Sequence, residues 1–238
     1  MMRHSSRLSP AVLLFVACAF WGAATVLNKA LLASISPVTL LVLELAPSAL
    51  VLWIMAFSSG SRISKLSLLA PLVLLGIFNP GVSYTLNMIG LARISAGVAT
   101  LLWAAEPLMI LGLAALILRE PVTWRLLLIM LVGVLGVALV ADVGGSIEAS
   151  RNDLLGILLL LSAVLCCAFY TVFSRKLSER VDPVFTVAVQ QTAGFAWALA
   201  LLSANTPFGS VADIRAISPD LLIESLIVCP IWPGCATT

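Results

Sequence analysis

Residues 154–174 read LLGILLLLSAVLCCAFYTVFS, a stretch of 21 positions without a charged side chain. A helix needs about 20 mostly apolar residues to cross the hydrocarbon core of a bilayer, so this stretch predicts a transmembrane helix. Six other stretches have a similar length and are nearly as apolar. The seven predicted spans cover residues 11–32, 38–57, 68–89, 94–118, 123–142, 154–174 and 184–204.

The composition of the whole chain agrees with these spans. Of the 238 residues, 61% are hydrophobic and only 10% are charged. A soluble domain has roughly 25% charged residues, so a water-soluble globular protein and a disordered chain are both excluded. Transmembrane β-strands would alternate polar and apolar positions over about 10 residues, whereas these runs are apolar on all sides. The sequence therefore predicts an all-α fold, a polytopic helical membrane protein.

The sequence carries no signature of catalysis, metal binding or nucleic-acid binding. The formal net charge is +2, and no basic run could follow a phosphate backbone. The single histidine, His4, lies in the N-terminal tail, and there is neither a Gly-x-Ser-x-Gly motif nor a phosphate-binding loop. We therefore expect no catalytic residue, no metal, no cofactor and no nucleic-acid partner. The five cysteines lack metal-ligand spacing and are interpreted as small core side chains: Cys18, Cys166, Cys167, Cys229 and Cys235.

Lysine and arginine are unequally distributed between the two sides of the predicted bundle. Cytoplasmic loops of membrane proteins carry an excess of these residues. With a cytoplasmic N-terminus, nine of them lie on the cytoplasmic side (Arg3, Arg7, Arg62, Lys65, Arg119, Arg125, Arg175, Lys176 and Arg180) and four on the other side (Lys29, Arg93, Arg151 and Arg215). We expect a multi-pass protein of the bacterial inner (plasma) membrane with its N-terminus in the cytoplasm.

An internal repeat relates the beginning of the chain to its second half. Displacing the sequence by 146 residues superimposes the first predicted span on the sixth without a gap. The most telling matches are Thr25 with Thr171, Pro37 with Pro183 and Lys29 with Arg175, and Glu44 falls on Gln190. Because an odd number of spans separates the two starts, the second copy has the opposite orientation in the membrane. Inverted repeats are typical of secondary transporters, which bind substrates near the midplane where the copies meet.

The repeat divides the chain into residues 1–145, with five predicted spans, and residues 146–238, with two spans and a short apolar segment. A complete second copy would continue to about residue 290, beyond Thr238. The last apolar run, residues 221–232, is too short to cross a bilayer, and it contains Glu224. We expect a truncated or frameshifted transporter that lacks most of its last three helices.

Two parts of the sequence carry a family pattern. The first span contains Phe-Trp-Gly at 20–22 and Asn-Lys at 28–29. The fourth and fifth spans contain SAGVATLLWAAEP at 95–107, LREPVT at 118–123 and GVLGV at 133–137. Over about residues 9–204 the chain thus resembles the EamA-like ten-helix permeases of the drug/metabolite transporter superfamily. The resemblance implies an importer or exporter of small metabolites with two repeats and a cytoplasmic N-terminus.

Two carboxylates lie inside predicted spans, where an ionisable side chain costs roughly 2.5–3.5 kcal/mol. Glu106 lies near the middle of the fourth span beside Pro107, which removes a backbone donor and opens the helix one turn earlier. Glu44 lies in the second span, and its repeat counterpart Gln190 and the neighbouring Gln191 are also polar. We predict that these side chains line a cavity for substrate and coupling ion. The alternative left open is that they only stabilise helix packing.

Amide, hydroxyl and aromatic side chains complete the predicted cavity. The third span carries one polar stripe, made of Asn79, Ser83 and Asn87. Pro80 predicts an interruption of this helix at mid-span, and broken helices line cavities in transporters. The remaining candidates are Trp21, Asn28, Trp103 and Tyr170. Gly133 and Gly136 are expected to allow close helix approach in the fifth span.

Together these features predict a secondary-type permease that moves small metabolites or drugs by alternating access, with protons as the candidate coupling ion. Its expected partners are a small-molecule substrate and the lipid bilayer, and a homodimer is left open. Two alternatives also stay open: a non-transporting permease fragment and a membrane-embedded lipid-modifying enzyme.

Overall fold

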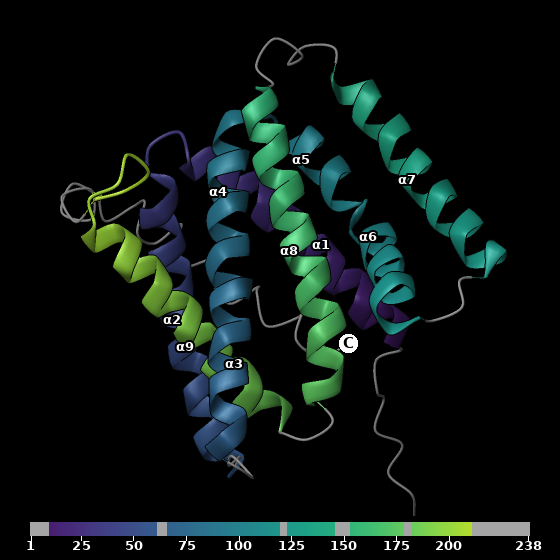
Figure 1. Cartoon of the computed structure of the whole chain (residues 1–238). Coiled ribbons are helices and arrows are strands. Elements are labelled where there is room, and N and C mark those ends of the chain that lie inside the picture. Colours follow the sequence, from purple (N-terminus) through teal and green to yellow (C-terminus); the bar gives the residue numbers. More distant parts are fainter. Residues whose placement is uncertain (1–9, 61–65, 120–122, 146–152, 179–181, 211–238) are drawn as a thin grey trace, which may run out of the picture.

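The computed structural model describes residues 10–60, 66–119, 123–145, 153–178 and 182–210, which form helices and contain no β-strand (Figure 1). The elements are α1 (Pro10–Leu31), α2 (Pro37–Ser58), η1 (Leu66–Leu68), α3 (Leu69–Gly76), η2 (Ile77–Val82), α4 (Ser83–Arg93), α5 (Ala96–Trp103), α6 (Glu106–Leu113), η3 (Ala114–Leu118), α7 (Trp124–Gly145), α8 (Leu154–Ser178) and α9 (Pro183–Ser203). The all-α fold class is confirmed. The apolar run at residues 221–232 lies outside the described residues.

Five of the helical stretches are long and apolar enough to cross a membrane, counted over the described residues alone. They are Pro37–Ser58, Leu69–Arg93, Ala96–Ile117, Leu154–Arg175 and Pro183–Ser203. Large apolar side chains such as Phe15, Phe57 and Leu116 point outward. Because such a surface suits lipid and not water, the fold is that of a polytopic helical membrane protein.

The third predicted span is interrupted at its centre. Asn79, within the π-helical segment η2, has the non-helical backbone angles φ −145° and ψ 115°. Pro80 follows it, lacks an N–H donor and cannot continue the regular hydrogen-bond pattern. The predicted interruption is confirmed, and it lies in a buried part of the bundle, since Asn79, Pro80 and Gly81 are all buried.

The fourth predicted span is also two helices. α5 ends at Trp103 and α6 begins at Glu106, with Pro107 in its first turn. The ring of Pro107 would clash with the Trp103 carbonyl in a continuous helix, which places the break one turn before the proline. Glu106 consequently becomes the first residue of α6, where the helix dipole favours a carboxylate.

α2 and α9 form an antiparallel pair. At one end the Val38 N–H donates to the Phe208 carbonyl, just beyond α9, at 3.0 Å. At the other end Ala56 and Ala188 share an apolar cluster. The second helix of each predicted repeat therefore contacts the other along its length.

α4 and α8 form a second antiparallel pair, and glycines allow them to approach closely. A Cβ atom on Gly90 would lie 2.9 Å from the carbonyl oxygen of Gly156. An ion pair of 2.8 Å between Arg93 and Asp153 joins the C-terminal end of α4 to the N-terminal end of α8. Asp153 also accepts a hydrogen bond from the Leu155 N–H, and this bond together with Arg93 holds the pKa of the Asp153 carboxyl below its usual range.

α1 and α8 run in opposite directions through the bundle (Figure 1). Near the end of α1, Lys29 Nζ donates to the Leu91 carbonyl at 2.8 Å, so α1 and α4 end on the same side. Because α8 is antiparallel to α4, it is also antiparallel to α1. An inverted repeat requires this relation, while the division into residues 1–145 and 146–238 remains a prediction from the sequence.

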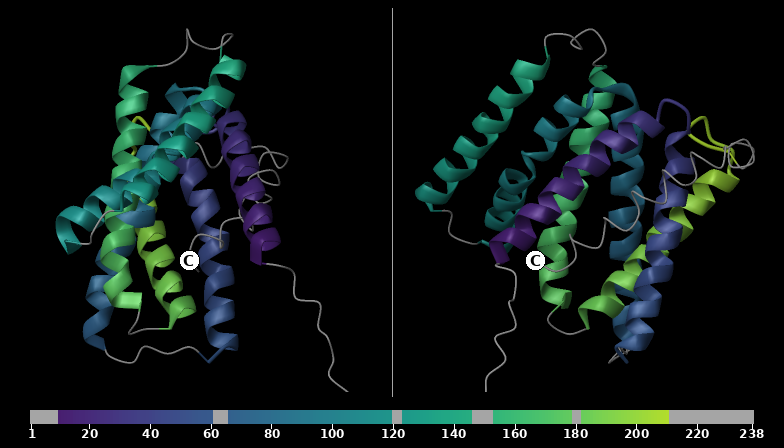
Figure 2. Two further views of the ribbon diagram at one scale, coloured as in Figure 1. Left: turned by 90° about the vertical axis from the view of Figure 1, so that its right-hand side faces the viewer. Right: turned by 180° about the vertical axis from the view of Figure 1, so that it is seen from behind.

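α7 lies at the edge of the bundle and packs against α5 and α6 (Figure 2). The expectation that Gly133 and Gly136 allow close approach is wrong for the described residues, because a Cβ atom on either would meet no atom within 4 Å. Close approach occurs instead at Gly76 and Gly194, where α9 crosses the interrupted third span. α7 is an outer helix, whereas the need for glycine arises where two helices cross in the interior.

Candidate functional site

Glu106 lies at a junction of three elements. α6 packs against α8, and the Cys167 side chain of α8 hydrogen-bonds the Glu106 carboxylate. Asn79 of η2 directs its Nδ2 donor at the Cys167 sulfur, at 3.9 Å. Cys167 therefore connects the helix break at Asn79 with the break before Glu106. Interrupted helices of this kind free polar backbone groups inside a membrane protein.

Glu44, the second carboxylate, is buried in α2 with 7% of its surface exposed. It has a hydrogen-bonding interaction with Asn28 of α1. One turn further along α2, Ser48 Oγ accepts a hydrogen bond of 2.9 Å from Gln191 Nε2 of α9. Glu44 therefore lies close to the seam between the first and second predicted repeats.

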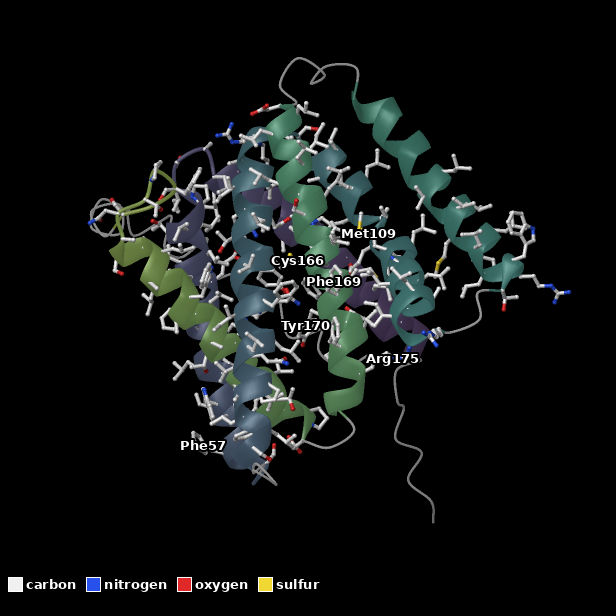
Figure 3. The ribbon with its side chains drawn as sticks, viewed as in Figure 1. Phe57, Met109, Cys166, Phe169, Tyr170 and Arg175 are labelled. Carbon is white, nitrogen blue, oxygen red and sulfur yellow. The ribbon has the colours of Figure 1, made fainter. Side chains whose placement is uncertain are left out.

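Tyr170 adds a contact between α8 and α9. Its hydroxyl donates to Gln190 Oε1 at 2.7 Å, and it lies on α8 one turn beyond Cys167, in the lower half of the helix as drawn in Figure 3. Polar side chains of both halves therefore contact one another at several points in the interior of the bundle. We call this set the polar network: Asn28, Glu44, Ser48, Asn79, Glu106, Cys167, Tyr170, Gln190 and Gln191.

Two tryptophans lie beside the network at the α5–α6 break. The rings of Trp21 and Trp103 meet edge to face with their centroids 5.7 Å apart. Trp103 Nε1 donates to Asn87 Oδ1 at 2.9 Å, which ties α5 to α4. Trp103 is the last residue of α5 and Glu106 the first of α6, so the two side chains come from opposite sides of the same break.

Ser83 differs from the other predicted site residues. It is fully buried, and its hydroxyl donates to the Ala163 carbonyl of α8 at 3.0 Å. The predicted stripe is divided in the structure: Asn79 and Ser83 contact α8, whereas Asn87 contacts α5. Ser83 therefore serves helix packing in this conformation.

Cys167 and Ser48 are the two members of the polar network that were not among the predicted site residues. The interpretation of the cysteines as small core side chains does not fit Cys167, and Cys18 is exposed. Two signals point to Cys167 in retrospect. It lies one turn before Tyr170, and it is the repeat counterpart of Trp21.

Several buried atoms of the network have no hydrogen-bond partner among the described residues. They are Asn28 Oδ1, Asn79 Oδ1 and Gln190 Nε2, and Trp197 Nε1 on α9 shares this condition. Leaving a buried polar atom unsatisfied costs about 1–3 kcal/mol, so such atoms mark positions where a ligand or water can bind. Within the described part of the chain, no group of three His, Cys, Asp or Glu side chains could hold a metal ion.

The first part of the chain matches a known protein family. Residues 8–141, the first five predicted spans, match the model described as the EamA-like transporter family. The chain belongs to this family. The resemblance seen in the sequence is therefore confirmed.

Two relatives of this EamA-like chain carry the description uncharacterized transporter. The relative from Archaeoglobus fulgidus is 29% identical over 173 residues, which cover 73% of this chain and 60% of the relative. YvbV of Bacillus subtilis is 30% identical over 230 residues, which cover 95% of this chain and 73% of the relative. The EamA-like chain thus spans about three fifths to three quarters of the length of these relatives.

Proposed function

We propose that this protein is a secondary permease that moves a small metabolite or drug across the membrane by alternating access. The observation that carries the proposal is the polar network, in which helices of both predicted repeats bring two carboxylates and several amides together inside a membrane protein. Secondary transporters built from inverted repeats place their substrate and ion sites at such a junction, next to interrupted helices. Rocking of one half against the other would then expose the network to each side in turn.

Glu106 and Glu44 are the proposed coupling groups. Cys167 contacts both Glu106, at the start of α6, and Asn79, at the break in the third span. A change in the protonation of Glu106 would therefore act where both helices are interrupted. Glu44 lies one turn before Ser48, which accepts a hydrogen bond from Gln191 of α9, so a movement of one half against the other would alter its surroundings. The excess of lysine and arginine in alternate loops supports a cytoplasmic N-terminus and insertion in the bacterial inner membrane.

Transport by the full 238-residue chain tests the proposal. The purified chain would be reconstituted in liposomes that enclose a pH-sensitive dye, and a panel of amino acids, nucleobases and ethidium would be added outside under an imposed pH gradient. We expect at least one compound to accelerate loss of the gradient relative to protein-free liposomes. A panel-wide rate equal to that of protein-free liposomes would contradict transport and favour the non-transporting alternative.

A further inference from the structure

The groups that surround Glu106 have a definite hydrogen-bonding character. The side chain that hydrogen-bonds the carboxylate is that of Cys167. Only 8% of the Asn79 surface is exposed, and its Nδ2 atom donates to the same sulfur. Its Oδ1 atom accepts no hydrogen bond from the described residues. The site therefore offers a carboxylate and an unused amide oxygen, both of which accept hydrogen bonds.

The second carboxylate repeats this arrangement. Asn28 lies beside Glu44 and is 2% exposed, and its Oδ1 atom also has no donor among the described residues. Where the end of α4 meets the start of α8, Lys29 donates to carbonyls of α4 and Arg93 pairs with Asp153. Beside each acid, the amide oxygen of a buried asparagine (Asn79 or Asn28) can therefore accept a hydrogen bond from an N–H donor.

We propose that the junction formed by Glu106, Asn79 and Cys167 binds the protonated amine of an organic cation, an inference that rests on the proposed transport function and names its substrate class. The ammonium group pairs with the Glu106 carboxylate and donates an N–H to Asn79 Oδ1. The apolar body of the substrate lies toward Trp103 and Trp21, whose aromatic faces also attract a cation. Charge-assisted hydrogen bonds of this kind are the stronger ones, particularly away from water.

Three compounds with one aromatic body and different charges test the substrate class. They are β-phenethylamine, which is a cation near neutral pH, the neutral phenylacetamide and the anion phenylacetate. Their binding to the purified full-length chain would be followed by tryptophan fluorescence. We expect the amine to bind at least about tenfold more tightly than the amide, and the acid to bind most weakly.

Variants test whether the junction of Glu106, Asn79 and Cys167 determines the preference for the amine. Glu106→Gln keeps the size of the side chain and is expected to remove the preference for the amine over phenylacetamide. Asn79→Ser removes the amide oxygen and is expected to weaken amine binding severalfold. Asp153→Asn removes an acid at the end of the bundle and is the matched control, for which we expect an unchanged preference.

Three results would overturn the inference. The first is phenylacetate binding as tightly as β-phenethylamine, which would point to the buried donors Gln190 Nε2 and Trp197 Nε1. The second is an unchanged amine preference in Glu106→Gln, and the third is no amine binding by the parent chain. Amine binding without uptake into liposomes would count against the transport function alone, and uptake of phenylacetate in place of the amine would count against this inference alone.

Discussion

Replacing Glu106 by Gln is expected to abolish the pH dependence of transport while the protein still inserts and folds. The amide has nearly the same shape as the carboxyl group, so the contact with Cys167 and the start of α6 are retained. It cannot gain or lose a proton, so a pH gradient no longer acts through this position. Coupling free energies between sites are typically 1–3 kcal/mol, so gradient-driven uptake is expected to fall about 5- to 150-fold.

The measurement is initial uptake at several external pH values in liposomes containing equal amounts of parent or variant chain. Glu106→Asp restores a titratable group and serves as the conservative comparison, with partial recovery expected. An identical pH profile for Glu106→Gln and the parent would remove Glu106 from the coupling role and leave Glu44 as the remaining candidate.

Replacing Gly76 by Ala is expected to destabilise the fold more than other glycine substitutions of the same size. The new Cβ atom would lie 2.5 Å from the carbonyl oxygen of Gln190 and 2.6 Å from its Cα atom. These are backbone atoms, so α9 has to move away from α3. Overpacking of this kind typically destabilises the folded protein by about 1–3 kcal/mol. Because the displaced residue is Gln190, its bond to Tyr170 is expected to weaken as well.

Gly133→Ala is the matched control on α7. A Cβ atom there meets nothing within 4 Å among the described residues, and alanine has the higher helix propensity. Thermal unfolding of both variants in the same detergent, followed by tryptophan fluorescence, makes the comparison. A Gly76→Ala melting temperature equal to that of Gly133→Ala would contradict the close crossing of α3 and α9.

The sequence predicted the helices well because the property that defines them is local. Each span needs only a long apolar run, and the ends were displaced by a few residues at most in α2 and α9. The two helix breaks were predictable for the same reason. Pro80 and Pro107 each remove a backbone donor, which favours a break within one turn, although α2 continues through Pro47.

The hydrogen-bond partners of the polar side chains could not be predicted, because they depend on how the helices cross and the sequence of a single span does not determine that. Asn79, Ser83 and Asn87 share a stripe in the sequence, yet the structure gives them contacts on two different helices. Cys167 has no polar signature of its own, and its importance comes from lying between Asn79 and Glu106. The positions of close approach, Gly76 and Gly194, likewise follow from the path of α9 across the bundle.

Alternating access depends most on the opposite orientation of the two halves in the membrane. It can be measured by replacing the native cysteines with serine and introducing one cysteine at a time at Ser59, after α2, or at Ser203, at the end of α9. Both positions are exposed in the structure. A membrane-impermeant maleimide is then applied to intact cells and to inside-out vesicles. We expect the cysteine at position 59 to react from one side only and that at position 203 from the other side only; reaction of both from the same side would contradict the inverted arrangement.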